Sequence, residues 1–202
     1  MLNMLLAIRT PVWLLAVALA LTMGACQREP SQPAEMPNLD PLGFGGDFSL
    51  TGHDGQPFRL QDLRGSAVLL FFGYTSCPDM CPLTMSRIAT ARDQLGAQAS
   101  RVATLFVSVD PNRDTPAVLK EYVASFAMPV TGLTGADEDI AKVAAAYHAA
   151  YQLVPASPHY QMNHTTAIFL IDPQGRLRGR FAYNEPPETL AAALRVLLNE
   201  GA

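Results

Sequence analysis

The sequence predicts an α/β domain that follows an N-terminal leader. Two largely apolar runs, at residues 67–74 and 102–109, are typical of strands buried on both faces of a sheet. Helical segments follow both runs, and a strand pair and a last helix close the chain, which is the order expected of an α/β layer structure. The chain has 202 residues, 49% of them hydrophobic, so one domain with a full core is expected.

The domain is expected to begin with a β-hairpin. Residues 48–50 and 57–60 flank the pair Asp54-Gly55, which favours a tight turn between two strands. The first buried strand, at residues 67–74, comes directly after this hairpin.

A helix is expected after the first buried strand, from Cys81 to about Leu95. Leu83, Ile88 and Leu95 have the spacing of residues that face inward, and Gly96 is expected to end the helix.

The second half of the domain continues the alternation of strands and helices. Thr115 is expected to cap a helix whose first residue is Pro116. The expected elements are a strand at residues 102–109, a helix at 116–126, a short strand at 130–133, a helix at 137–148, strands at 166–171 and 177–183, and a helix at 187–198.

The first 25 residues have the features of a targeting segment. Arg9 is their only charged residue, and residues 12–23 are almost wholly apolar. Two small residues then precede Cys26, and this order resembles a bacterial lipoprotein signal peptide whose cysteine becomes lipidated, although Met23 stands where leucine is usual. An uncleaved membrane helix over residues 2–25 is the alternative. Both alternatives place the domain on a membrane tether, facing the periplasm or another extracytoplasmic space.

Residues 26–46 are rich in proline, glycine and small polar residues, and they are expected to form a flexible linker. The domain is then expected to span residues 47–202. The net charge of −4 argues against a nucleic-acid partner.

Two cysteines, Cys77 and Cys81, lie where the first buried strand leads into a helix. Positions i and i+4 share a helix face, so both sulfurs can approach one point, and a helix N-terminus favours thiolates. Two thiols at one point suit a soft metal ion or thiol–disulfide chemistry. A purely structural disulfide or a pair of buried core cysteines is the alternative, but such a disulfide would close a very small loop and add little stability.

His164 is the candidate for a third ligand. It stands shortly before the apolar residues 167–171, and a strand–Cys–helix unit early in an α/β chain indicates a thioredoxin-like fold, in which this loop faces the cysteines. The usual redox motif has two residues between the cysteines, whereas this chain has three. The other histidines, His53, His148 and His159, lie in an expected turn, helix and loop, and they are expected to be surface residues.

Three motifs together resemble the SCO/SenC family. They are Tyr74-Thr75-x-Cys77-Pro78-Asp79-x-Cys81-Pro82, Ser108-Val109-Asp110-Pro111-x-Arg113-Asp114-Thr115-Pro116, and His164-Thr165-Thr166 followed by Ile-Asp-Pro. The resemblance extends from about residue 46 to the C-terminus. It implies a membrane-tethered, thioredoxin-like metallochaperone that helps to assemble the copper centre of cytochrome c oxidase.

The same resemblance implies the ligands and the partners. Cys77, Cys81 and His164 would bind copper as Cu(I) or Cu(II). The partners would be the copper-binding subunit of cytochrome c oxidase, a periplasmic thiol reductase and a copper donor chaperone.

Several positions near the motifs remain open. Met80 stands where valine is usual in the family and Asn163 where aspartate often precedes the histidine. Met80 would either pack the loop or offer a thioether. Asp110, Arg113 and Asp114 would dock a partner, orient the cysteine loop, or only form a turn and a helix cap.

Two enzymatic alternatives share the expected fold. In a thiol–disulfide oxidoreductase, the more exposed Cys77 would attack a substrate disulfide and Cys81 would resolve the mixed disulfide. A peroxidase of the peroxiredoxin type would need a proline where this chain has Gly73, which argues against that function.

Overall fold

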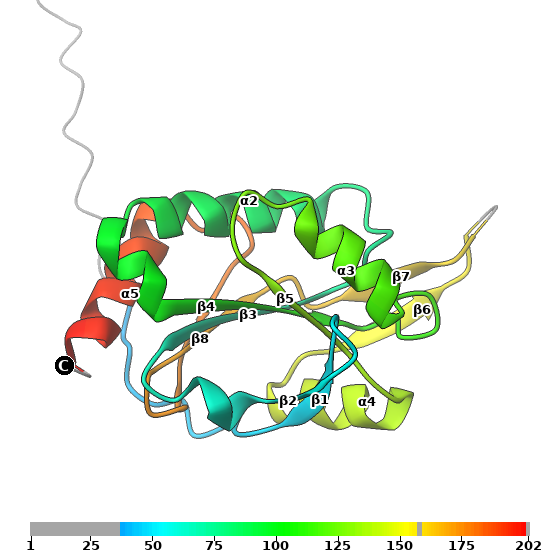
Figure 1. Ribbon diagram of the computed structural model, residues 1–202, viewed down its shortest axis with the longest axis horizontal. Coiled ribbons are helices and arrows are strands. Elements are labelled where there is room, and N and C mark those ends of the chain that lie inside the picture. The colour runs from blue at the N-terminus through cyan, green and yellow to red at the C-terminus, as the bar shows by residue number, and fades with distance from the viewer. Residues whose placement is uncertain (1–36, 157–158, 201–202) are drawn as a thin grey trace, which may run out of the picture. The chain divides into compact units, whose positions relative to one another are not determined.

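A seven-stranded mixed sheet forms the centre of the domain (Figure 1). The computed structural model of the protein describes residues 37–156 and 159–200. The strands of the sheet are β1 (Ser49–Gly52), β2 (Pro57–Arg59), β3 (Ala67–Gly73), β4 (Val102–Ser108), β5 (Thr131–Thr134), β8 (Ile168–Ile171) and β9 (Leu177–Phe181). They lie in the order β2-β1-β5-β4-β3-β8-β9. The predicted α/β fold with a mixed sheet and an N-terminal β-hairpin is confirmed.

Helices cover both faces of this sheet. They are α2 (Met80–Asp93), α3 (Pro116–Ala124), α4 (Asp137–Ala146) and α5 (Pro187–Glu200), with short 3₁₀ helices at Leu60–Leu63 and Gly96–Arg101. In Figure 1, α2 and α3 lie above the sheet, α4 lies below it, and α5 lies at the left-hand end, where it packs against α2. No helix in residues 37–156 and 159–200 is long and apolar enough to span a membrane.

Strand β3 is the centre of the core. All seven of its residues are buried, and it pairs parallel with β4 and antiparallel with β8. Because side chains alternate across a strand, Leu69 and Phe71 join the cluster under α2 and α5, while Leu70 and Phe72 join the cluster above α4. The strand therefore holds both layers together and ends at the cysteine loop.

Helix α2 differs from its prediction in register. It begins at Met80, and Cys81, Met85 and Ile88 form its buried face. The prediction that Leu83 faces inward is wrong, because this side chain falls on the outer face and is 44% exposed.

A two-stranded ribbon was not predicted. It consists of β6 (Tyr151–Val154) and β7 (Gln161–His164), which pair antiparallel and extend beyond the right-hand end of the sheet in Figure 1. His164 is the last residue of β7 rather than part of a loop, and β8 starts only at Ile168.

The predicted linker is too long, because residues 37–46 pack on the domain. Leu39 is buried, the backbone N–H of Leu42 donates to the carbonyl of Leu177 at 2.9 Å, and the hydroxyl of Tyr147 donates to the carbonyl of Gly46 at 2.8 Å. The domain thus begins ahead of residue 47. The predicted leader, the lipidation site Cys26 and the rest of the linker lie outside the described residues.

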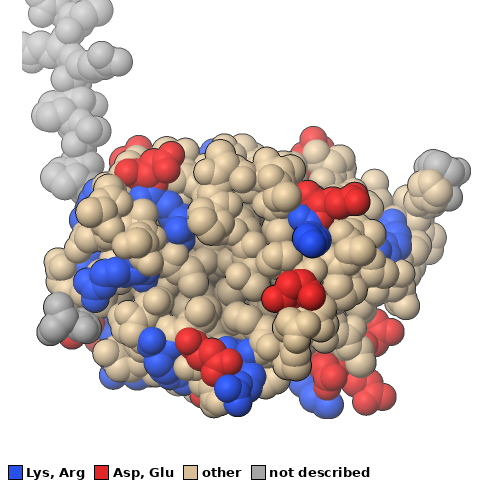
Figure 2. Space-filling view, viewed as in Figure 1, with Lys and Arg blue, Asp and Glu red and all other residues tan. Residues whose placement is uncertain are grey.

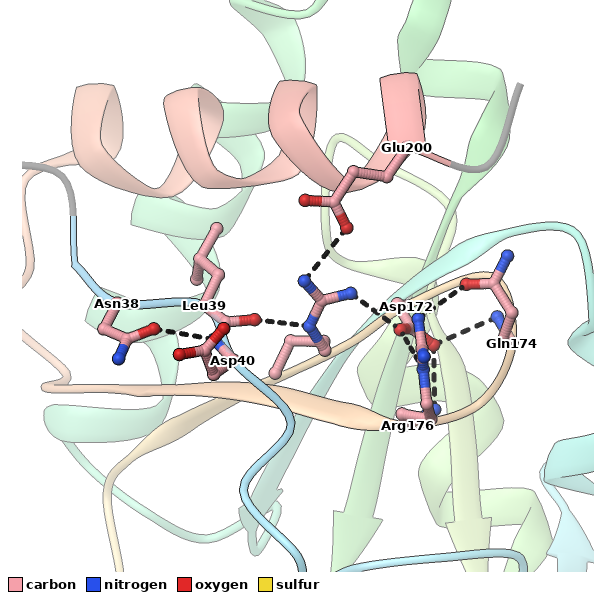
Figure 3. Close-up of polar contacts among 8 residues, drawn as sticks. Asn38, Leu39, Asp40, Asp172, Gln174, Arg176 and Glu200 are labelled. Carbon is pink, nitrogen blue, oxygen red and sulfur yellow. Dashed lines mark hydrogen bonds and ion pairs between the residues drawn. The ribbon is translucent and has the colours of Figure 1, made fainter.

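Arg178 connects this first segment to the turn between β8 and β9 and to the end of α5. Its partners Leu39, Asp172 and Glu200 are labelled in Figure 3. Its buried guanidinium donates to the carboxylates of Asp172 and Glu200, each at 2.9 Å, and to the carbonyl of Leu39. Charge-assisted hydrogen bonds of this kind are stronger than neutral ones. Segment 37–46 is therefore fixed beside the start of β9.

Candidate metal centre

The cysteine loop leads from the end of β3 into α2. Cys77 lies three residues before the first residue of α2 rather than at the helix start, and it is half-buried, whereas Cys81 in the first turn is fully buried. The Sγ of Cys77 accepts a hydrogen bond from the backbone N–H of Cys81 at 3.4 Å. The sulfur thus takes the place of a side-chain cap at the start of α2. The two cysteines meet through this loop rather than through a shared helix face.

His164, the last residue of β7, lies next to the cysteines. Its Nδ1 lies 3.0 Å from the carbonyl oxygen of Thr165, and because a carbonyl only accepts, Nδ1 carries the proton. The lone pair of Nε2 is then free, and this atom lies 3.7 Å from the Sγ of Cys81. Phe71 and Tyr74 meet the imidazole edge-on, at ring distances of 6.0 and 5.7 Å.

The three predicted ligands are brought together. One ligand atom from each of Cys77, Cys81 and His164 lies within 4.8 Å of the others. The set contains two soft sulfurs and one imidazole nitrogen, which suits Cu(I), Cu(II) or Zn²⁺.

The two thiols have unequal acidity. The pKa of Cys77 is lowered to about 3, first by its hydrogen bond with Cys81 and further by hydrogen bonds from backbone N–H groups, although burial opposes the shift. The pKa of Cys81 is raised by the hydrogen bond with Cys77 and by burial. The reduced pair therefore holds one thiolate, on the more exposed Cys77, and one proton, on Cys81.

Asp114 holds the cysteine loop. Its fully buried carboxylate accepts hydrogen bonds from the hydroxyl of Thr75 at 2.6 Å, the backbone N–H of Thr75 at 2.9 Å and the hydroxyl of Ser108 at 2.6 Å. Of the three roles open for this residue, these contacts favour orienting the loop.

Arg113 and Asp110 hold the ribbon instead. Arg113 donates to the carboxylate of Asp110 and to the carbonyl of Tyr160 at 3.0 Å, and its guanidinium lies 3.8 Å from the centre of the Tyr160 ring. The hydroxyl of Tyr160 donates to Asp110 at 2.8 Å. Tyr160 stands directly before β7, so these contacts fix the strand that ends at His164.

Gly73 leaves room for the buried sulfur. A Cβ at this position would lie 2.8 Å from the Sγ of Cys81 and 2.7 Å from the ring of Phe106. Neither this role of Gly73 nor the contacts of Tyr160 were predicted from the sequence. Both roles depend on contacts between separate elements, for which the local sequence carries no signal.

The other histidines lie elsewhere in the described part of the chain. His53 is half-buried, not a free surface residue, since its Nδ1 accepts from the backbone N–H of Gly132 at 3.1 Å. His148 is exposed and stacks on Phe44 at 4.2 Å, and His159 is exposed. Met80 is the first residue of α2 and is half-buried, and Asn163 is exposed on β7.

The surface around His164 is hollowed. A cavity of about 440 Å³ is lined by His164, Arg180 and Tyr183 among others, and a second of about 370 Å³ reaches His164 from the side of Tyr151. Figure 2 shows acidic and basic side chains interspersed over one face of the domain. The imidazole is therefore accessible from outside.

Known proteins share both the sequence and the fold. The family model described as SCO1/SenC matches residues 37–199. An SCO2-like protein of Rickettsia felis is 33% identical over 174 residues, which cover 83% of this chain and 85% of that protein. Copper-bound ScoI of Bradyrhizobium japonicum is 40% identical, with a TM-score of 0.70 over 76% of this chain and 99% of that one. An SCO1/SenC family lipoprotein of Bacillus anthracis is 27% identical, with a TM-score of 0.69 over 80% and 99% of the two chains.

These similarities bear on both the fold and the family. The match in three dimensions confirms the thioredoxin-like fold that the cysteine motif predicted. The family match spans nearly all of the described domain. The chain therefore belongs to the SCO1/SenC family.

Proposed function

We propose that this protein is a copper chaperone that holds one copper ion through Cys77, Cys81 and His164. The observation that carries the proposal is the convergence of the three ligand atoms within 4.8 Å, with the lone pair of His164 Nε2 free. The copper in the similar ScoI structure supports the choice of metal. The copper ion is the cargo, and its acceptor is the copper-binding subunit of cytochrome c oxidase during assembly of that enzyme.

The unequal thiols suit loading and transfer. Cys77 offers a thiolate at the half-exposed rim, and Cys81 releases its proton as the metal binds, because ligands bind in deprotonated form. Two thiolates satisfy Cu(I), and the imidazole adds the nitrogen that Cu(II) favours. Since Cys77 is open to solvent, thiols of an acceptor or of a copper donor chaperone can reach the metal by ligand exchange.

Copper titration of the reduced protein tests this function. We expect one copper per monomer, and we expect Cys77→Ser and Cys81→Ser to abolish tight Cu(I) binding. An exposed-site variant, Thr90→Ser on the outer side of α2, serves as the control. Unchanged Cu(I) affinity in the double cysteine variant would refute the metal site.

The same thiols support a second candidate function, reduction of disulfides in the oxidase subunit or another periplasmic protein. An exposed thiolate beside a buried thiol is the arrangement of an attacking and a resolving cysteine. Turnover of a mixed disulfide by the copper-free protein would support it. A Cys77→Ser variant that retains the reductase activity would exclude it.

A membrane tether through Cys26 is proposed from the leader sequence and from the similarity to a family lipoprotein. It would place the domain in the periplasm or another extracytoplasmic space, where a thiol reductase is needed to keep Cys77 and Cys81 reduced. A Cys26→Ser variant that stays in the membrane with an intact leader would favour the uncleaved helix instead.

A further inference from the structure

We propose that residues 110–114, the turn between β4 and α3, support both halves of the metal centre. Asp114 positions the cysteine loop, and Arg113 positions the strand that carries His164. This inference rests on the proposed metal site and assigns roles to residues that are not themselves ligands.

The contacts of Asp114 support the cysteine loop and form the first of two supports, called the Asp114 arm. Its two carboxylate oxygens join Thr75, two residues before Cys77, to Ser108 at the end of β4. β4 is fixed in turn, because Ser108 pairs with Gly73 in the parallel ladder and the backbone N–H of Val109 donates to Gly73 at 2.8 Å. The loop that carries the sulfurs is therefore fixed to the ends of both β3 and β4.

The contacts of Arg113 support the strand that carries His164 and form the second support, called the Arg113 arm. Its guanidinium forms a hydrogen-bonded and stacked contact with Tyr160, and it lies 5.7 Å from the ring of Tyr74. Tyr74 meets the imidazole of His164 edge-on. The ribbon β6-β7 belongs to a separate sheet, so these contacts help to set the distance of His164 from the cysteines.

The turn itself is braced by its own hydrogen bonds. The backbone N–H groups of Arg113 and Asp114 donate to the carbonyl of Asp110 at 3.1 and 2.9 Å, and that of Asp110 donates to the hydroxyl of Ser108 at 3.0 Å. Arg113 and Asp114 are adjacent residues of this turn, and each makes the contacts of one arm. A shift of the cysteine loop relative to the strand of His164 must therefore strain the turn. Supports of this kind orient metal ligands without touching the metal.

Copper titration should distinguish the effects of variants in the two arms, because Cu(I) needs mainly the thiolates and Cu(II) needs the imidazole as well. Thr75→Val removes one hydrogen bond of the Asp114 arm, and we expect it to lower the affinities for Cu(I) and Cu(II) alike by about tenfold. Thr75→Ser keeps the hydroxyl and should restore both affinities. Asp114→Asn should act in the direction of Thr75→Val, and more strongly.

Arg113→Ala should act on the other arm. We expect it to lower the Cu(II) affinity by about tenfold and to change the energy of the thiolate-to-Cu(II) absorption band, with the Cu(I) affinity retained. Arg113→Lys cannot reproduce the forked contact, so it should behave like Arg113→Ala. Controls for charge removal are Asp139→Asn and Arg59→Ala, which alter exposed ion pairs of other elements.

The experiment uses the purified, reduced protein, with circular dichroism to select folded variants, and the mild Thr75 pair keeps the test valid if Asp114→Asn does not fold. Wild-type affinities and absorption band in both Thr75→Val and Arg113→Ala would overturn the proposal. Equal loss of Cu(I) and Cu(II) binding in Arg113→Ala would also overturn it, because the arms would not be separate. If the double cysteine variant also bound copper normally, the metal site itself would be wrong.

Discussion

Replacing Gly73 by alanine tests whether the position of the buried sulfur is set by close packing. The added Cβ would lie 2.8 Å from the Sγ of Cys81, 0.6 Å closer than the 3.4 Å at which ordinary contact begins. It would also lie 2.7 and 2.9 Å from two ring atoms of Phe106. Cys81 and Phe106 are both fully buried, so neither side chain can move aside into solvent.

Overpacking of this kind costs about 1–3 kcal/mol. For a domain of this size, that cost corresponds to a fall in Tm of about 2–12 °C. The shift demanded of the sulfur exceeds the tolerance of about 0.2 Å that metal–ligand distances allow. We therefore expect weaker Cu(I) binding in folded Gly73→Ala protein, measured by competition with a chromophoric chelator, together with the lower Tm.

Gly135→Ala is the matched control. Its Cβ would meet the end of the flexible Leu50 side chain at 3.2 Å, away from the cysteines, so copper affinity should be retained. If Gly73→Ala keeps both the wild-type Tm and the wild-type Cu(I) affinity, the argument from close packing fails.

Three further predictions concern the ligands. His164→Ala should weaken Cu(II) binding more than Cu(I) binding, and equal losses for both ions would show that the histidine is misassigned. Oxidation to a Cys77–Cys81 disulfide should block loading until a reductant is added, so Cu(I) binding by the oxidised protein at the reduced protein's affinity would point to other ligands. Because the pKa of Cys77 lies far below that of a free thiol, alkylation of the copper-free protein by iodoacetamide should be nearly as fast at pH 5 as at pH 7. Cys81→Ala removes the main cause of that shift and should make the rate fall between pH 7 and pH 5.

Strands with continuous apolar sequence were predictable because burial on both faces leaves a direct signal. β3 and β4 were found in this way, and so was the cap of α3, where Thr115 accepts from the backbone N–H of Val118 at 3.4 Å. The ribbon β6-β7 gave no such signal, because most of its residues are at least partly exposed. Leu83 was misplaced because the helix starts at Met80, which sets its buried face through Cys81 and Met85.

The residues of the candidate site were identifiable from the sequence, but the contacts that support them were not. Cysteines and a histidine show their chemistry in the residue type, and their motifs placed them at neighbouring element ends. Asp114 is 39 residues from Thr75 and Tyr160 is 50 residues from Asp110. Contacts over such separations depend on how the elements pack, so one sequence could only leave the roles of Asp110, Arg113 and Asp114 open.

The contacts of residues 37–42 with Arg178 and Leu177 hold this segment at the end of the sheet opposite the cysteine loop. Leu39 and Leu42 contact the start of β9, which pairs with the end of β8 and, through it, with the start of β3, whereas the cysteines follow the end of β3. Seven strand residues separate these two poles, a span of about 20 Å. The segment through which the chain enters the described domain therefore lies at the opposite end of β3 from the candidate metal site.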